Sequence, residues 1–222
     1  AWFAERLQAE GRDVPAIIKA ANGQPLYREE GGVRQQMTLS GDYVDIVVDE
    51  NAWMLEDKKR GQEPIAKNGS ASLWDVGDGV ACLEFHSKMN SIDGDIVAMI
   101  MKATKLHKEG FKALIIGNDA DNFSVGANIG LSLFAANTAM WPIIEQGVKA
   151  GQDAYLALKY APFPVVAAPA GMALGGGCEV TMHCDAVQAH AESYMGLVEV
   201  GVGLIPGWGG CKELLMRQTL NK

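Results

Sequence analysis

The alternation of apolar and polar residues predicts strands and helices in turn along most of the chain. Two short apolar runs, 72–76 and 80–86, are joined by Gly-Asp-Gly and predict a β-hairpin. Longer apolar runs at 113–118 and 164–170 are typical of buried strands, and another strand is expected over 185–191. Because segments of helical periodicity separate these strands, the sequence predicts an α/β architecture.

The expected helices are recognised by apolar residues that recur every three or four positions. The first has Ser91 as its N-cap and is closed by Gly110. Two more are expected near 131–136 and over 143–160, and a short helix follows the glycine run at 175–177.

The first 55 residues differ from the rest in their pattern of apolar and polar positions. They predict a helix from Asp13, as its cap, to Ala21, and strands over 33–39 and 43–48. This segment is too short to bury much core by itself. Residues 56–70 are charged, contain proline and glycine and lack periodicity, so they are interpreted as an interdomain linker. The chain has no initial methionine and stops soon after a glycine-rich turn, and we expect it to be a piece of a longer protein.

Composition and charge narrow the class of ligand. The chain has 222 residues, of which 48% are hydrophobic, enough for the core of a globular protein. Nineteen basic against 27 acidic residues give a net charge of −8, which argues against nucleic acid or an anionic membrane as partner but still admits a small anionic ligand. We expect neither a membrane span nor export, because Pro169 and Glu179 interrupt the most apolar region.

The pattern of cysteines and histidines predicts no disulfide, metal site or catalytic triad. The four cysteines show no CxxC pair and are expected to be free thiols in a reducing, cytoplasmic compartment. The four histidines show no pattern of a metal site or a nucleophile. His183, Cys184 and Asp185 are adjacent on a helix end and point in different directions, which argues against a catalytic triad.

Two glycine-bearing turns are candidates for binding negative charge. In residues 122–130 and 171–180 a buried strand leads through such a turn into a helix, where backbone N–H groups lack partners. If both turns meet at one point, they form an oxyanion hole for a carbonyl oxygen. Either turn alone is also compatible with tight packing only. A dinucleotide-binding site fits less well, because the G-x-G-x-x-G spacing is absent.

Two acids, Glu179 and Glu199, lie among apolar neighbours. Burial there raises the pKa of a carboxyl group, which suits acid–base work near neutral pH. Each acid alone is also compatible with a structural role, Glu179 as a cap or in a salt bridge and Glu199 facing solvent. Together they predict a cleft with two carboxyl groups.

These motifs also carry a family resemblance. "FSVGANI", "ALGGGCEV" and "GLVEVGVGLIPGWGG" closely resemble the crotonase, or enoyl-CoA hydratase/isomerase, superfamily from about Ser72 to the end of the chain. "FHSKMNSID" at 85–93 and the first segment resemble more particularly bacterial bifunctional 3-hydroxyacyl-CoA dehydrogenases with a C-terminal hydratase domain. The resemblance implies a crotonase-like fold of repeated β-β-α units. It implies that residues 1–55 are the trailing part of a dehydrogenase-like domain and that 71–222 are an incomplete hydratase domain.

The resemblance also implies roles for four residues in catalysis. The backbone N–H groups of Ala127 and Gly176 hold the thioester carbonyl as an oxyanion hole. Glu179 activates the water that attacks C3, and Glu199 exchanges a proton at C2.

Further residues are implied in binding the substrate. The CoA-binding stretch falls on Ser87, Lys88 and Met89, together with Asn128 and Ile129; Asn128 stands where many relatives have aspartate. Lys88 is equally compatible with an ordinary solvated lysine. An acyl tunnel is one interpretation of four apolar residues, and plain core is the interpretation that their helical spacing favours: Phe134, Met140, Trp141 and Ile144.

We therefore expect an enoyl-CoA hydratase, which adds water in syn geometry to trans-2-enoyl-CoA in fatty-acid β-oxidation. The alternatives are a 3-enoyl-CoA isomerase and a non-catalytic module for acyl-CoA binding or oligomerisation. The CoA thioester is the substrate, hydration implies no cofactor, and NAD belongs only to a dehydrogenase part. The resemblance also implies a homo-oligomer of the trimer type.

Overall fold

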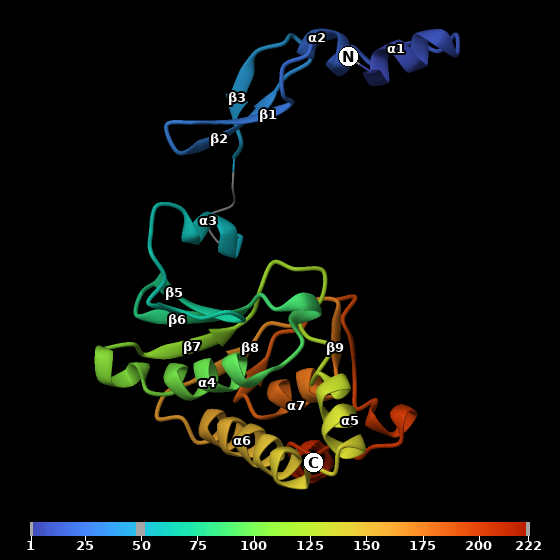
Figure 1. The fold of residues 1–222 in the computed structure, drawn as a ribbon. Helices are drawn as coiled ribbons and strands as arrows, with labels where there is room; N and C mark the ends of the chain where they lie inside the picture. The colour runs from blue at the N-terminus through green and yellow to red at the C-terminus, as the bar shows by residue number, and fades with distance from the viewer. Residues whose placement is uncertain (1, 48–51, 221–222) are drawn as a thin grey trace. The chain divides into compact units, whose positions relative to one another are not determined.

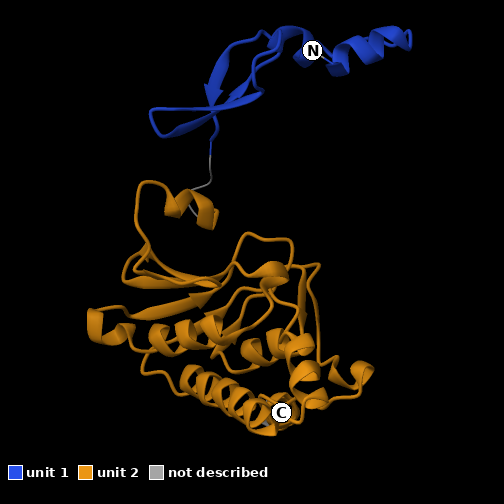
Figure 2. Ribbon diagram, in the orientation of Figure 1, with its two compact units in different colours: residues 1–53 blue, residues 54–222 orange. Residues whose placement is uncertain are grey.

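The computed structural model describes residues 2–47 and 52–220, and the chain divides into two compact units. The units are Ala1–Trp53 and Met54–Lys222, which Figure 2 shows in different colours. Each is described below by itself.

The first unit is a small antiparallel sheet with two short helices. Its elements are α1 (Trp2–Ala9), α2 (Ala16–Ala21), β1 (Tyr27–Glu30), β2 (Val33–Met37) and β3 (Tyr43–Asp45), and the strand order is β1-β2-β3. The two predicted strands are confirmed over these shorter ranges, while residue 48 lies outside the described residues. β1 escaped prediction because all of its residues are exposed and most are charged.

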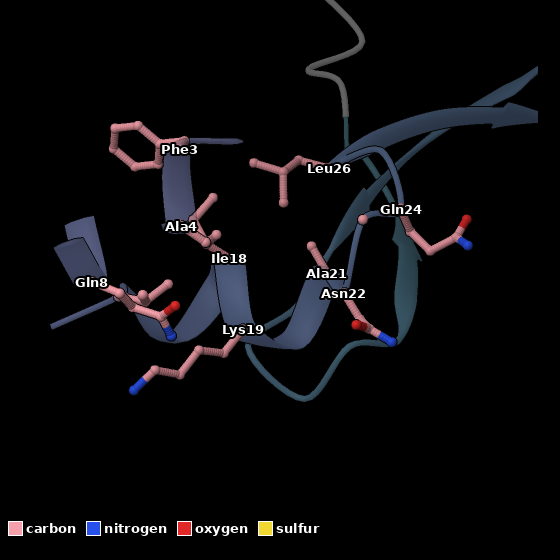
Figure 3. A pocket seen from close by; sticks show the side chains of 11 residues that line it. Phe3, Ala4, Gln8, Ile18, Lys19, Ala21, Asn22, Gln24 and Leu26 are labelled. Atoms are coloured by element: carbon pink, nitrogen blue, oxygen red, sulfur yellow. The ribbon is translucent and has the colours of Figure 1, made fainter. Parts of the chain in front are cut away.

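The helix α2 ends as predicted but begins differently. Asn22 closes it in the left-handed conformation with φ 43°, whereas Pro15, and not Asp13, occupies the N-cap. A pocket of about 540 Å³ lies beside α1 and α2, and Phe3, Ile18 and Leu26 give it apolar walls, as Figure 3 shows.

The second unit is built on a six-stranded sheet. The order is β10-β8-β7-β6-β5-β4, in which β6, β7, β8 and β10 run parallel and β4 and β5 antiparallel to their neighbours. The strands are β4 (Ala66–Lys67), β5 (Ala71–Gly77), β6 (Val80–Phe85), β7 (Ala113–Ile116), β8 (Val165–Ala167) and β10 (Ala186–Val187). The predicted hairpin and the two buried strands are thereby confirmed, with β10 shorter than expected.

A second, two-stranded sheet pairs β9 (Met172–Leu174) in parallel with β11 (Tyr194–Gly196). Neither strand was predicted. They are short, and their apolar pattern is interrupted by the turns that they flank.

The longer helices lie on one face of the main sheet, and the short helix α3 packs against part of the other (Figure 1). Leu73, Leu83 and Ile116 share one face through the strand register and pack in the core with Ile96 and Ile100 of α4. Trp74, Cys82 and Ile115 share the other face with Leu55 of α3. The helices are α3 (Leu55–Lys59), α4 (Gly94–Ala103), α5 (Ile129–Asn137), α6 (Trp141–Lys159), α7 (Gly176–Met182) and α8 (Gly210–Leu220), and the 3-10 turns are η1 (Lys88–Asn90), η2 (Leu106–Glu109) and η3 (Glu199–Val202).

The helix predicted from Ser91, α4, begins two residues later than predicted. Asp93, and not Ser91, is the N-cap of α4, and its Oδ1 accepts a hydrogen bond of 3.0 Å from the N–H of Ile96. The hydroxyl of Ser91 donates instead to the carbonyl of Gly126 at 3.2 Å. Gly110 closes the 3-10 turn η2 with φ 94°, after α4 itself has ended at Ala103.

The predicted linker, residues 56–70, is wrong for this structure, because much of it belongs to the second unit. Residues 55–59 form α3, whose first N–H groups, of Leu55 and Glu56, donate to the carboxylate of Asp119 at 3.3 and 2.8 Å. Ala66 and Lys67 form the edge strand β4. A helix capped by a carboxylate sixty residues downstream leaves no local signal in its own sequence.

The apolar residues that helical spacing favoured as core are exposed. Phe134 is 64% and Trp141 60% exposed, and Met140 is exposed as well, while Ile144 is half-buried. The core interpretation is therefore wrong for Phe134, Met140 and Trp141. Phe134 lies on α5, which is apolar on all sides, so its spacing there does not mark a buried face.

The four cysteines are free, as predicted, and Cys82, Cys178 and Cys184 are buried. Among the helices that the structure describes, none combines the length and the apolar composition needed to cross a membrane.

We expect Asp119→Ala to release α3 from the sheet. The substitution removes the acceptor of the first two N–H groups of the helix, a loss worth about 1 kcal/mol. Trypsin should then cleave faster after Lys58 and Lys59 than in the parent protein, as measured by mass spectrometry of timed digests. Asp121→Ala, an exposed aspartate of the same loop, is the control. Equal cleavage rates for Asp119→Ala and the parent would contradict this anchoring.

Candidate active site

Two chain segments run side by side and bring two backbone N–H groups together. Ser124 forms a parallel bridge with Ala173, and its carbonyl accepts a hydrogen bond of 2.9 Å from the N–H of Leu174. The N–H of Phe123 donates at 2.9 Å to the carbonyl of Ala170. These bonds align residues 122–127 with residues 170–176.

The alignment ends at the predicted oxyanion hole. The nitrogen of Gly176 lies 3.0 Å from the place where a Cβ on Gly126 would stand, and the nitrogen of Ala127 lies 3.5 Å from the Cβ place on Gly176. Within residues 2–47 and 52–220, neither N–H donates a hydrogen bond. Two neighbouring amides without acceptors can bind one carbonyl oxygen.

Each glycine of the run 175–177 has a neighbour that a side chain would strike. Gly175 has φ 52°, and a Cβ there would stand 3.1 Å from Oε1 of Glu199. A Cβ on Gly176 would meet the ring of Trp208 at 2.7 Å, and one on Gly177 the carbonyl of Ser124 at 2.5 Å. Glycine at these three positions therefore allows the two segments to lie close together and allows the carboxylate of Glu199 to approach Gly175.

Glu179 is a buried carboxyl group held by two amides. It lies in the first turn of α7 and is 1% exposed, and its Oε1 accepts hydrogen bonds from the N–H groups of Trp208 at 2.9 Å and Gly210 at 2.8 Å. Burial raises the pKa of Glu179, the two amide bonds act against that rise, and the charge of Glu199 adds to it. The elevated pKa suits a group that exchanges protons.

Glu199 points inward although its neighbours point outward. It begins η3 and is half-buried, whereas Val198 and Val200 are exposed. Its Oε2 is buried and has no hydrogen-bond partner among the described residues. A buried carboxylate oxygen without a partner is costly in a folded protein and is available to a ligand.

Both acids lie close to Gly175. The N–H of Glu179 donates to the carbonyl of Gly175 at 2.8 Å, and the carboxylate of Glu199 approaches the same glycine. The neighbouring thiol of Cys178 is unreactive, since burial and then the charges of Glu199 and Glu179 raise its pKa to about 11. The structure thus brings together the four residues predicted for catalysis.

The residues predicted to bind CoA gather in one open pocket of about 640 Å³. Its walls include all five of them and also Ala127: Ser87, Lys88, Met89, Asn128 and Ile129. Two of their polar side chains are engaged within the protein, because Ser87 donates to the carbonyl of Ser91 at 2.7 Å and Asn128 accepts from the N–H of Gly130 at 3.1 Å. The ammonium of Lys88 remains as an exposed charge, and Ala127, one of the two residues of the predicted oxyanion hole, also lines the pocket.

Sequence reasoning missed Trp208 and Gly210, the donors to Glu179. The indole of Trp208 packs edge-on against Tyr155, with ring centroids 5.4 Å apart, and Tyr155 donates to the carbonyl of Gly176 at 2.8 Å. The motif GWGG contained the signal, since glycines on both sides of a tryptophan indicate a close backbone approach. Among the residues that the structure describes, no group of three or more His, Cys, Asp or Glu is placed to hold a metal ion.

The sequence profile of the enoyl-CoA hydratase/isomerase family matches residues 75–219. The chain belongs to this family. It is 42% identical over 214 residues to a probable 3-hydroxyacyl-CoA dehydrogenase of Bacillus subtilis (strain 168), an alignment that covers 95% of the chain and 27% of that protein. It is 38% identical over 137 residues to a putative fatty acid oxidation complex trifunctional enzyme of Rickettsia felis, covering 61% of the chain and 19% of the relative.

Solved structures of hydratases share the fold. An enoyl-CoA hydratase from Bacillus anthracis matches with a TM-score of 0.59 and 24% identity over 66% of this chain and 57% of its own. One from Polaromonas sp. JS666 matches with a TM-score of 0.62 and 21% identity over 66% of this chain and 58% of its own. The predicted crotonase-like α/β fold is confirmed. The chain spans about a quarter of the Bacillus subtilis relative.

We expect Glu179→Gln to stabilise the fold at neutral pH. The raised pKa means that the folded state disfavours the charged form, so this carboxylate reduces stability above pH 4.5, its ordinary pKa, and the loss is complete above the raised pKa. Glutamine carries no charge and keeps an acceptor for the two amides. Thermal melts should show a higher Tm at pH 7, by about 2–4 °C for each kcal/mol gained, and a gain that vanishes as the pH falls below 4.5.

The control for this comparison is Glu145→Gln, which removes an exposed charge from α6. An increase in Tm of Glu179→Gln that is the same at both pH values would refute the electrostatic cause.

Proposed function

We propose that this chain is an enoyl-CoA hydratase, which adds water in syn geometry to trans-2-enoyl-CoA and forms 3-hydroxyacyl-CoA in fatty-acid β-oxidation. One observation carries the proposal: the buried carboxyl group of Glu179 and the half-buried one of Glu199 flank Gly175, next to two paired amides that have no acceptor among the described residues. A hydratase needs this combination, because a carbonyl oxygen must be held while protons move on both sides of the double bond.

The amides supply the electrostatic part of the reaction. When water attacks C3 of the enoyl thioester, electrons shift through C2 onto the thioester oxygen. The N–H groups of Ala127 and Gly176 would hold that oxygen and stabilise its developing charge, an effect worth about 3 kcal/mol for each donor. Gly176 cannot carry a side chain, since the Trp208 ring occupies the Cβ place.

The two acids supply the proton transfers. Ionised Glu179 takes one proton from the attacking water as the water oxygen bonds to C3, and Glu199, in its acid form, gives one proton to C2 as the charge returns from the thioester oxygen. A proton then passes from Glu179 to Glu199, which restores both acids for the next turnover. One water is then added across the double bond, with its hydroxyl on C3 and a proton on C2. The partnerless Oε2 of Glu199 supports this assignment, because it is free to meet the substrate.

The open pocket would take the CoA part of the substrate. It leads from the exposed Lys88 to the Ala127 amide, so a ligand lying in it brings a thioester to the oxyanion hole. A lysine at its edge suits the phosphates of CoA. Hydration itself uses only these groups and requires no prosthetic cofactor.

We further propose that the first unit is the trailing part of a 3-hydroxyacyl-CoA dehydrogenase-like domain. The alignment with the Bacillus subtilis relative covers 95% of the chain, whereas the family profile begins only at residue 75. The relative therefore shares the first unit as well. The product of hydration would be the substrate of such a dehydrogenase, and NAD would belong to that part of the protein.

We expect the purified protein to hydrate crotonyl-CoA, measured by the loss of absorbance of the conjugated thioester. Glu179→Gln and Glu199→Gln should each lower kcat by about 10²–10⁴-fold with little change in KM, since each removes a proton-transfer group and leaves the binding pocket intact. Glu192→Gln, at an exposed acid, is the control and should keep the parental rate.

A 3-enoyl-CoA substrate assayed in parallel separates the alternatives. If the protein turns over 3-enoyl-CoA but not crotonyl-CoA, the proposed hydratase activity is wrong and isomerase activity takes its place. Tight binding of crotonyl-CoA without any turnover by the folded protein would favour the non-catalytic module. An unchanged rate in Glu199→Gln would remove that residue from the mechanism.

A further inference from the structure

The amides that hold Glu179 come from a single loop. Trp208 and Gly210 both lie in the turn that leads into α8, and Oε1 of Glu179 accepts from both. The loop has little space, because a Cβ on Gly210 would meet Cγ of Glu179 at 3.0 Å. The placement of α8 therefore determines where these two donors lie.

A buried ion pair fixes α8 to α6. Glu213, in the first turn of α8, is 2% exposed, and its two carboxylate oxygens accept from Nζ of Lys159 at 2.6 and 2.8 Å. The N–H of Glu213 donates to the carbonyl of Gly209 at 3.0 Å, so the residue that anchors the helix also bonds directly to the loop. Lys212 adds an exposed contact at 2.9 Å.

His183 lies between this ion pair and the backbone of Glu179. Its Nδ1 lies 2.8 Å from the carbonyl oxygen of Glu179. Because a carbonyl only accepts, Nδ1 carries the proton, and Nε2 faces Oε1 of Glu213 at 3.7 Å. The imidazole is 1% exposed and packs on Tyr155 with ring centroids 5.4 Å apart. Glu179 is thus held at its backbone carbonyl by His183 and at its carboxylate by the loop that Glu213 anchors.

We propose that Glu213 is a positioning residue for the reaction: through its ion pair with Lys159 and the hydrogen bond of its N–H to the carbonyl of Gly209, it holds the Trp208 and Gly210 amides against the carboxylate of Glu179. The expected effect of Glu213 on turnover rests on the function proposed above. The structural part of the proposal, the control of Glu179 by Glu213, is measurable without turnover.

Charged and titratable groups from several elements face Glu213 and Glu179. Glu213 meets Lys159 from α6, His183 at the end of α7 and Lys212 from α8, and although burial opposes them, these groups lower the pKa of Glu213. Burial lowers the pKa of His183, so the imidazole remains neutral near pH 7. The titratable groups that face Glu179 are Glu199, Tyr155 and Cys178. Since the two amides stabilise the charged form of Glu179, their displacement must raise its pKa.

The test compares Glu213→Gln with the parent in the purified protein. Glutamine keeps the volume and removes the charge that binds Lys159. We expect kcat for crotonyl-CoA to fall about 10- to 100-fold with KM nearly unchanged, because misplacement of a catalytic group by about 1 Å has effects of this size. The acidic limb of the kcat profile should move to higher pH. Lys159→Arg, which restores a cation, should recover most of the rate relative to Lys159→Met.

Asp153→Asn is the matched control. It removes an exposed ion pair of the same helix, between Lys149 and Asp153 at 2.9 Å, and should leave the rate and the pH profile unchanged.

A second measurement follows Glu179 itself. In protein labelled with ¹³C at the glutamate carboxyl carbons, the Glu179 signal is identified by its loss in Glu179→Gln, and its titration should move to higher pH in Glu213→Gln. If the parent protein does not hydrate enoyl-CoA and this titration still moves, the proposed function fails while the positioning role stands. If the titration coincides with that of the parent in a folded Glu213→Gln protein, the proposal is overturned. If Glu213→Gln does not fold, the Glu179 titration is measured in Lys159→Met instead. A shift to higher pH there supports the proposal, and a titration that coincides with that of the parent overturns it.

Discussion

The candidate site depends on the alignment of residues 122–127 with residues 170–176. Hydrogen bonds between Phe123 and Ala170 and between Ser124 and Leu174 bring two turns together that are nearly fifty residues apart in the chain. Without these hydrogen bonds the amides of Ala127 and Gly176 would not be neighbours in space. Nothing would then require three consecutive glycines. The parallel sheet makes this alignment rigid, because β7 and β8, the strands that lead into the two segments, are hydrogen-bonded neighbours in a buried layer.

The site contains features that stability alone does not explain. Glu179 is buried with a raised pKa, and Oε2 of Glu199 is buried without a partner. Two amides have no acceptor in the part of the chain that the structure describes, and three consecutive glycines carry a cost in backbone entropy. All of these groups lie close in the fold to Gly175 or to its neighbour Gly176. Such a concentration of unfavourable groups is typical of a binding or catalytic site, since the substrate supplies the missing partners.

Much of this fold was predictable where the determinants are local. The hairpin at 72–86, the buried strands β7 and β8 and the glycine turns are set by nearby residues, and the prediction from sequence was right there. It was wrong or incomplete where the determinant is distant or lies on another element: Asp119 caps α3, the carbonyl of Gly126 takes the hydroxyl of Ser91, and Trp208 and Gly210 bind Glu179. Glu199 shows the same limit, because its apolar neighbours turn outward while the acid turns inward.

The two acids are held differently, and this asymmetry fits their proposed roles. Glu179 has one oxygen bound to two amides of a loop that Glu213 and Lys159 anchor, so fixed dipoles stabilise its charged form against the cost of burial. Glu199 sits on a short 3-10 turn with one oxygen against Gly175 and the other unpartnered. A group that must accept a proton from water benefits from a fixed orientation. A group that must reach C2 of a substrate needs a free oxygen, because any internal partner would have to be displaced before the proton could be delivered.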